Sequence, residues 1–365
     1  MKKLLAALQA TAIGAGLALG GAAVVNAKDY MVTASRPNNL YLIDLEARKV
    51  VNNCEIPGVF SPAVIVMSPD NTIAYILNDR WENVYGIAVD SCDVVFSAIQ
   101  STETVRVKTI ASMAGSPDGK ELYTIQAPVK LLRDRMEVMD TRFVGFDTSA
   151  GQNAQPVRSY PAPRRVSTMS SGKDGTVYMA GHDIMAMNPK TGEIRVAIAN
   201  ANWDRPTYGT PDVLAFWPIG SVSREFLLMY TAPKFTDESQ EELADFVWGY
   251  SRVDLDTGET EIDDFASVEV LMFSAVTHPK NKDLLYGVYS QLSKHDLKND
   301  TLIKRIDLDH TYYCINISTD GSEVYVGGTN ADIAVYDSET LDRIATIDIP
   351  GGGDMGTATI QVFSR

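Results

Sequence analysis

The side chains best suited to chemistry in this chain are three cysteines and four histidines. Neither set has the spacing of a reactive motif. The cysteines, at positions 54, 92 and 314, form no Cys-x-x-Cys or Cys-x-x-Cys-His sequence, so the chain offers no c-type haem attachment site and no redox dithiol. The histidines, at positions 182, 278, 295 and 310, have no metal-ligand spacing. Those at 278 and 295 lie beside turns, and we expect them to be surface or local hydrogen-bonding residues.

Two nucleotide-binding and nucleophile signatures are also missing. The sequence contains no Gly-rich phosphate loop and no Gly-x-Ser-x-Gly nucleophile elbow. We therefore predict no catalytic residue and no metal in this chain. Any function should then depend on binding surfaces, and their position depends on the elements that carry them.

Turn signals recur along the chain at intervals typical of a β-propeller. An apolar strand end followed by Asp or Asn recurs seven times, between 41 and 66 residues apart, at Asp44, Asp90, Asp147, Asn188, Asp254, Asp296 and Asp337. A tight turn precedes it in five repeats, for example Ser116-Pro117-Asp118-Gly119 and Thr319-Asp320-Gly321. Four short antiparallel strands in about forty residues make one propeller blade. The alternative is a β-sandwich, but the constant order of two independent turn signals favours an all-β, seven-bladed β-propeller.

The ends of the chain and two insertions complete this architecture. Residues 357–363 alternate like a strand, and the first blade, from Asp29, shows only three strands. We therefore predict that the C-terminal strand pairs with the N-terminal blade and closes the ring. Residues 131–140 alternate apolar and charged side chains and predict an extended hairpin. Residues 234–245 are acidic and predict a solvated loop with one helical turn.

The segments that lead from the outer strand of one blade to the inner strand of the next should cross one face of the ring toward its axis. Loops on a rigid scaffold often carry binding sites. These crossings are rich in aromatic and charged residues, which are typical interface anchors. The candidate substrate-cavity or partner-facing residues are Tyr208, Asp212, Phe273, Tyr312 and Tyr313. Each could instead fill the channel or pack between blades.

Cys54 and Cys92 fall at outer positions of neighbouring blades, one and two. In an oxidising compartment such neighbours can pair, so we predict a disulfide bond between them. Cys314 lies on an inner strand and should be a small buried apolar residue.

Residues 1–27 have the pattern of a secretory signal peptide. Lys2 and Lys3 precede an apolar stretch rich in Ala and Gly, and Val25-Asn26-Ala27 resembles a cleavage site. The alternative is an uncleaved membrane anchor. We expect residues 28–365 to form a single propeller domain in a bacterial periplasm. The formal charge of −15 becomes −17 without the two lysines, which argues against nucleic acid and anionic membranes as partners.

From about Asp29 to Arg365 the chain resembles the β subunit of quinohemoprotein amine dehydrogenase. The segments that carry the resemblance are residues 127–131 (APVKL), 208–217 (YGTPDVLAFW), 272–276 (MFSAV) with His278-Pro279, and 312–328. The resemblance implies a periplasmic heterotrimer that oxidises primary amines. In that family a di-haem cytochrome c subunit and a small subunit with cysteine tryptophylquinone hold the cofactors, and electrons pass to a soluble carrier. The β subunit has no cofactor. The predicted disulfide is not part of the resemblance.

A free-standing periplasmic propeller, either a lactonase-like hydrolase or a binding protein, is the alternative. A hydrolase of this fold usually needs an axial metal held by several Asp, Asn or Glu side chains. The crossings offer Asp212 and Asp354 and little else, which disfavours the hydrolase. Co-elution with a haem-bearing subunit would separate the two readings.

Overall fold

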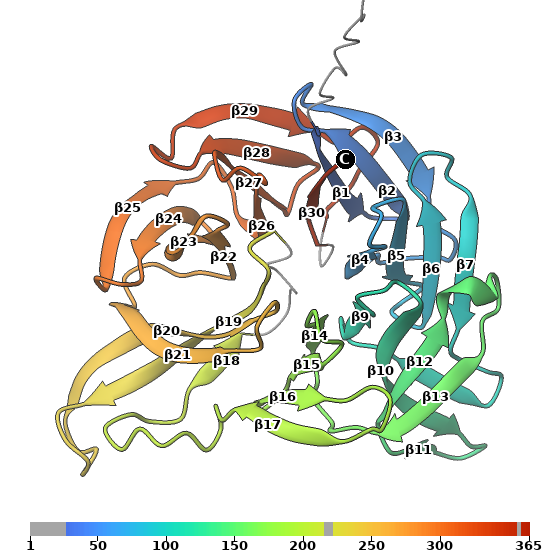
Figure 1. Ribbon diagram of the computed structural model, residues 1–365, viewed down its shortest axis with the longest axis horizontal. Coiled ribbons are helices and arrows are strands. Elements are labelled where there is room, and N and C mark those ends of the chain that lie inside the picture. Colours follow the sequence, from blue (N-terminus) through green and yellow to red (C-terminus); the bar gives the residue numbers. More distant parts are fainter. Residues whose placement is uncertain (1–26, 215–221, 356–358) are drawn as a thin grey trace, which may run out of the picture.

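The chain folds into a ring of seven antiparallel sheets around a central axis, as the computed structural model shows for residues 27–214, 222–355 and 359–365 (Figure 1). The predicted seven-bladed β-propeller is confirmed. From the axis outward, blade one holds β30 (Gln361–Ser364), β1 (Asp29–Ser35), β2 (Asn39–Asp44) and β3 (Lys49–Glu55), and blade two holds β4 (Ile65–Met67), β5 (Ile73–Asn78), β6 (Asn83–Ala88) and β7 (Val94–Ile99). Blade three holds β9 (Met113–Gly115), β10 (Glu121–Leu131), β12 (Arg142–Asp147) and β13 (Pro156–Pro161), with β8 (Val105–Lys108) and β11 (Met136–Val138) paired to the far end of β10.

The remaining four blades have four strands each. Blade four holds β14 (Thr168–Ser171), β15 (Val177–Ala180), β16 (Ile184–Met187) and β17 (Ile194–Ile198), and blade five holds β18 (Asp212–Leu214), β19 (Glu225–Phe235), β20 (Leu243–Asp254) and β21 (Thr260–Ser267). Blade six holds β22 (Ser274–His278), β23 (Asn281–Val288), β24 (Gln291–Asp296) and β25 (Thr301–Asp307), and blade seven holds β26 (Tyr312–Ile317), β27 (Glu323–Gly328), β28 (Asp332–Asp337) and β29 (Arg343–Asp348). The 3-10 helix η1 (Thr148–Ala150) follows β12. No helix of the described residues is long and apolar enough to cross a membrane.

The two ends of the chain meet in blade one. Strand β30 pairs antiparallel with β1, with Tyr30 opposite Phe363 and Met31 opposite Val362. The predicted closure of the ring is therefore confirmed. Closure removes the free sheet edge that β1 would otherwise expose.

Side chains of the tight turns explain why the first hairpin of a blade recurs. In blade two, the Ser68 hydroxyl donates to Asp70 at 2.6 Å and accepts from the backbone N–H of Ile73 at 2.9 Å. The pairs Ser116–Asp118 and Ser318–Asp320 repeat the arrangement in blades three and seven. Because these bonds satisfy backbone groups inside the turn, each hairpin begins from local sequence alone.

The apolar core is divided among the spaces between blades. One cluster joins Val276 and Tyr286 of blade six to Ile315 and Tyr336 of blade seven, and the clusters between other blades are built in the same way. The outer strands carry half-exposed patterns instead, as in β25. Each blade therefore depends on its two neighbours for burial, as in other repeat architectures.

A disulfide bond joins Cys54, near the end of β3, to Cys92, in the turn after β6, with the two Cα atoms 5.1 Å apart. It links blade one to blade two at their outer side. Cys314 lies outside the disulfide and is buried.

Two blades carry long hairpins between their second and third strands. In blade three, β11 pairs with the end of β10, as predicted for residues 131–140. In blade five, the predicted helical turn is wrong, because β19 and β20 continue their ladder out to Phe235 opposite Leu243. The acidic residues 236–242 form only the exposed turn, where Asp237 accepts from the backbone N–H of Ser239 at 2.8 Å.

Candidate functional site

One face of the ring, which we call the crossing face, gathers most of the predicted site residues. It holds the links from each outer strand to the next inner strand, and also the turns from second to third strands, because both connections leave the same strand ends. The long hairpins of blades three and five therefore extend from this face. The tight Ser-x-Asp turns lie on the opposite face.

An aromatic triad on the crossing face joins blades six and seven. Phe273 precedes β22, Tyr289 follows β23, and Tyr313 is the second residue of β26. The ring of Phe273 lies 4.5 Å from that of Tyr289 and 5.4 Å from that of Tyr313, centroid to centroid. The Ser274 hydroxyl donates to the Tyr313 carbonyl at 2.6 Å and fixes the two crossings together. Phe273 and Tyr313 are half-buried, so they keep an open surface on a rigid base.

Tyr312 lies elsewhere, and its predicted place at the mouth of the channel is corrected. Successive residues of a strand point to opposite sides, so Tyr312 turns into the core between blades six and seven, where none of it is exposed. Its hydroxyl lies 3.0 Å from an Asp309 oxygen and 3.1 Å from an Asp332 oxygen, so its single proton is shared between two acceptors. Burial, together with the charge of Asp332, raises the pKa of Tyr312. Its role is structural.

Tyr208 is also separated from the triad. Its hydroxyl donates to Asp264 of the outer strand β21 at 3.0 Å, and its backbone bridges Lys234 near the end of β19. The guanidinium of Arg205 lies 3.7 Å from the centre of the Tyr208 ring and also pairs with Asp264. Burial alone would raise the pKa of Asp264, but hydrogen bonds from Arg205 and Lys234 outweigh it and lower that pKa. Tyr208 thus braces the blade-five hairpin.

Asp212 remains at the mouth of the channel. It is the first residue of the inner strand β18 and is exposed. It lines a cavity of about 340 Å³ with Arg165 and His182 of blade four. This pocket combines one carboxylate with a guanidinium and an imidazole, so Asp212 does not act as an isolated negative charge there.

Exposed apolar side chains are numerous on the crossing face. Leu271 is 61% exposed, Val59 is 62% exposed and Ile110 is 46% exposed, and all three lie in crossings. Phe60 is 44% exposed beneath the Arg36 guanidinium, which lies 5.1 Å from its ring. The blade-three hairpin adds Met136, Val138 and Met139. Where exposed apolar side chains form one patch they mark an interaction site, and the crossing face is the candidate for such a patch.

Sequence reasoning missed Tyr289, Val59 and Ile110. Tyr289 lies in a turn between the second and third strands, and the predicted crossings did not include such turns. The signal available was topological, because those turns share the face of the crossings. Val59 and Ile110 lie in the crossings themselves, outside any strand, where an apolar side chain has no strand partner to cover it.

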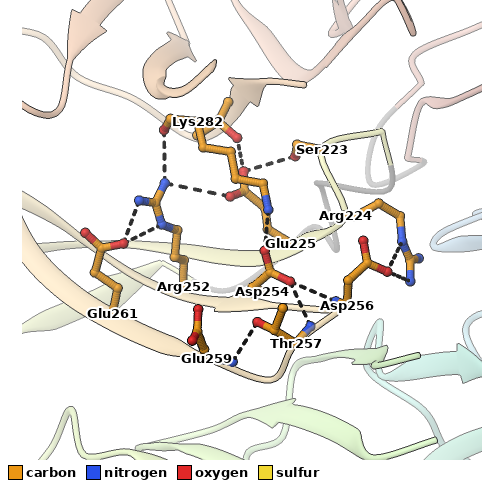
Figure 2. A network of polar contacts seen from close by, with 11 residues as sticks. Ser223, Arg224, Glu225, Arg252, Asp254, Asp256, Thr257, Glu259, Glu261 and Lys282 are labelled. Atoms are coloured by element: carbon orange, nitrogen blue, oxygen red, sulfur yellow. Dashed lines mark hydrogen bonds and ion pairs between the residues drawn. The ribbon is translucent and has the colours of Figure 1, made fainter. Parts of the chain in front are cut away.

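A buried polar network on the opposite side of blade five is the other chemically notable group (Figure 2). The Glu225 side chain is 0% exposed and accepts from the hydroxyls of Ser223, at 3.0 Å, and Thr277. Its second oxygen lies 3.9 Å from Arg252, which also pairs with Glu261. Burial raises the pKa of Glu225.

This network is an inter-blade clamp. Arg252 donates to the Lys282 carbonyl of blade six at 2.9 Å, and the Lys282 ammonium pairs with Asp254 at 2.6 Å. Glutamates also begin the second strands of blades three and seven, where Glu121 pairs with Arg158 and Glu323 with Arg48. The recurrence indicates a structural element. Among the described residues, no three His, Cys, Asp or Glu side chains are grouped as a metal would require.

His295 is not at the surface, and of its two predicted roles it has the local hydrogen-bonding one. It is 2% exposed, packed edge-on against Phe265, and bonded to the Ser293 hydroxyl at 3.0 Å. Burial lowers its pKa to about 4. The apolar strand position, rather than the nearby turn, decides its environment.

Comparison with known proteins gives a fold and nothing finer. No family model matches the chain, and no curated protein matches it. Among solved structures it is similar to the dihydro-heme d1 dehydrogenase NirN in complex with DHE, at 12% identity and a TM-score of 0.56, covering 92% of this chain and 75% of that one. It is also similar to hydrazine synthase of Kuenenia stuttgartiensis, at 15% identity and a TM-score of 0.53, covering 84% of this chain and 90% of that one. A third similar structure is apo AztD from Citrobacter koseri, at 9% identity and a TM-score of 0.54, covering 93% of this chain and 99% of that one. At these identities the likeness establishes a seven-bladed propeller scaffold.

Proposed function

We propose that this chain is the non-catalytic propeller subunit of a periplasmic complex that oxidises primary amines, of the quinohemoprotein amine dehydrogenase type. Its crossing face binds the small subunit that carries the quinone, and a di-haem cytochrome c subunit takes the electrons on to a soluble carrier. The observation that carries this proposal is the exposed aromatic and apolar surface of that face, flanked by two long hairpins. The sequence resemblance supplies the identity of the partners.

The physical role of the face is to exclude water and to order its partner. A carbonyl that condenses with an amine works best where bulk water is absent, because water competes for the carbonyl and screens the charges. Aromatic side chains provide large contact area at low cost in conformational entropy. The triad of Phe273, Tyr289 and Tyr313 is already ordered by mutual contacts and by the Ser274 hydrogen bond. It can therefore close over a cofactor-bearing surface without rearranging.

Surface variants test the proposal. Replacing Phe273 and Tyr313 by Ala should loosen the quinone subunit or raise the KM for a primary amine by roughly thirtyfold, since buried aromatic anchors contribute about 1 kcal/mol or more each. Haem content should stay constant. The matched controls are Val157→Ala and Val196→Ala, because these valines are 53% and 55% exposed on outer strands. Normal assembly and unchanged kinetics in the double variant would show that this face is not the functional one.

A free-standing binding protein is the second candidate function. It is favoured by one observation, a cavity on the ring axis at the face opposite the crossing face. The two candidates differ in their surfaces. A subunit should lose its partners when the crossing face is altered, whereas a free-standing propeller has no stable partner to lose.

A further inference from the structure

A cavity opens on the ring axis where the tight turns of the opposite face surround it. Its volume is about 470 Å³, within the usual range of small-molecule sites. Inner strands β4, β9 and β14, the start of β19 and the closing strand β30 supply its lining. The proposed subunit role uses none of these residues.

The lining has an apolar part and a polar part. Val66 and Met67 of blade two, which are half-buried, belong to the apolar part, together with Met113 of blade three and Met169 of blade four. The polar part includes Ser68 and Asn71 of blade two and Ser170, Ser171 and Lys173 of blade four. A ligand that satisfies both parts of this wall has a short apolar chain and one polar or charged end.

The charged side chains of the lining indicate which charge the polar end of the ligand carries. Both carboxylates of the lining are already engaged: Asp256 accepts from Arg224 at 3.2 Å, and Glu225 accepts from the hydroxyls of Ser223 and Thr277. Lys173 is exposed, lines both this cavity and a neighbouring one of about 430 Å³ that also contains Asp174, and makes no ion pair with any carboxylate in the described part of the chain. The charge of this lining that has no ion-pair partner is therefore an ammonium, which can bind an anion.

The position of Lys173 is also unusual within the repeat. The same turn position holds Pro69 in blade two and Pro117 in blade three, where proline favours the turn. In blade four the backbone N–H of residue 173 donates to the Leu255 carbonyl of blade five at 2.7 Å, which excludes proline. Any other residue could make that bond, so it does not account for a lysine. It does hold the Lys173 backbone rigidly at the edge of the cavity.

We propose that this axial cavity binds a small aliphatic carboxylate. The Lys173 ammonium donates to the carboxylate, the Ser170 and Ser171 side of the wall surrounds it, and the aliphatic chain packs against Val66 and Met67. A primary amine would place its ammonium beside Lys173 and Arg224 and is disfavoured there. The net charge of the chain does not prevent binding, because physiological salt screens charges beyond about 8 Å.

Calorimetry with three probes of one shape tests the proposal on the full exported chain, with any partners it carries. Hexanoate should bind saturably, whereas hexanamide and hexylamine, its neutral and cationic counterparts, should bind at least tenfold more weakly. Lys173→Gln should weaken hexanoate binding by roughly tenfold, the contribution expected of one charged hydrogen bond. Lys173→Arg should retain it.

The matched control is Lys298→Gln, which makes the same charge change in a turn remote from the cavity lining. It should leave hexanoate binding unchanged. The proposal is overturned if hexanoate does not bind saturably in the millimolar range, if hexylamine or hexanamide binds as well, or if Lys173→Gln and Lys298→Gln behave alike. None of these outcomes depends on whether the chain belongs to an amine-oxidising complex.

Discussion

Glu225 and His295 are two buried ionisable side chains that respond to burial in opposite ways. Loss of water disfavours the charged form of each, so it raises the pKa of the acid and lowers that of the imidazole. Glu225 is compensated by hydroxyl donors and Arg252, whereas Nδ1 of His295 has no hydrogen-bond partner among the described residues. Both side chains therefore contribute to the pH dependence of stability.

Replacing Glu225 by Ala should destabilise the ring by about 3 kcal/mol, because it leaves the buried hydroxyls of Ser223 and Thr277 without their acceptor and removes one of the two carboxylates beside Arg252. Glu261 pairs with the same arginine, but its side chain is 48% exposed, so Glu261→Ala should cost less than about 1 kcal/mol. Urea unfolding of the two variants measures the difference in the free energy of unfolding. Equal losses would contradict the clamp.

Acid should destabilise the protein through His295. Its folded pKa of about 4 lies below the usual value of 6.5, so the unfolded state binds more protons as pH falls below 6.5. The stability present at pH 7 is therefore lost progressively toward pH 4, by about 2–3 kcal/mol at pH 4.5. His295→Gln should remove this part of the pH dependence. Identical slopes for variant and wild type between pH 4.5 and 7 would refute it.

The strands and turns are the level at which sequence was most informative. Asp-Gly and Pro-Asp turns with alternating apolar residues are local signals, and they predicted the blades, the closing strand and the blade-three hairpin. The blade-five hairpin was mistaken for a solvated loop, because the acidic composition of residues 236–242 suggested a loop, whereas the pairing of β19 with β20 continues on either side of them to Phe235 and Leu243. Such pairing depends on a strand that lies elsewhere in the sequence.

The candidate site could be predicted less well than the blades. Tyr312 and Tyr313 are neighbours in sequence, yet one is buried between blades and the other lines the crossing face. Which of the two points inward depends on the register of β26 with β27, which shifts at this place. Tyr208 lies away from the aromatic triad because its hydroxyl bonds to Asp264, a partner 56 residues away in the sequence. Side-chain partners across blades are not visible in a single sequence.

Strand β30 should be essential to the ring. Truncation before Gln361 would expose the edge of β1 and uncover Met31 and Tyr41, which pack against Val362 in the same core cluster. We expect insoluble protein from the truncated chain and soluble protein from a chain that lacks only Arg365. A soluble truncation with an unchanged melting temperature would argue against closure by this strand.

The stability of the whole ring depends on the contacts and bonds that join neighbouring blades. The disulfide between Cys54 and Cys92 spans 38 residues and fastens blade one to blade two at their outer side. On the chain-entropy model a loop of this length stabilises by about 4 kcal/mol. Cys92→Ser should lower the free energy of unfolding by up to that amount. Thiol titration of the denatured, unreduced wild type should find one thiol, that of Cys314, and three thiols would show that the bond is absent.

The two faces of the ring have different characters. The crossing face carries exposed aromatic and apolar side chains and both long hairpins, whereas the opposite face carries polar turns around an axial cavity. A propeller that meets partners on one face and a small ligand on the other can do both without competition. The proposed subunit role concerns the crossing face alone.

Purification of the untagged protein from its native host tests that role most directly. We expect the chain to elute in one peak with a haem-absorbing subunit and a small quinone-bearing subunit, and we expect this peak to oxidise primary amines. Disruption of the triad by Phe273→Ala with Tyr313→Ala should release the small subunit from the peak. Elution of the wild-type chain at the size of a single polypeptide, with neither haem absorbance nor a small partner, would contradict the account.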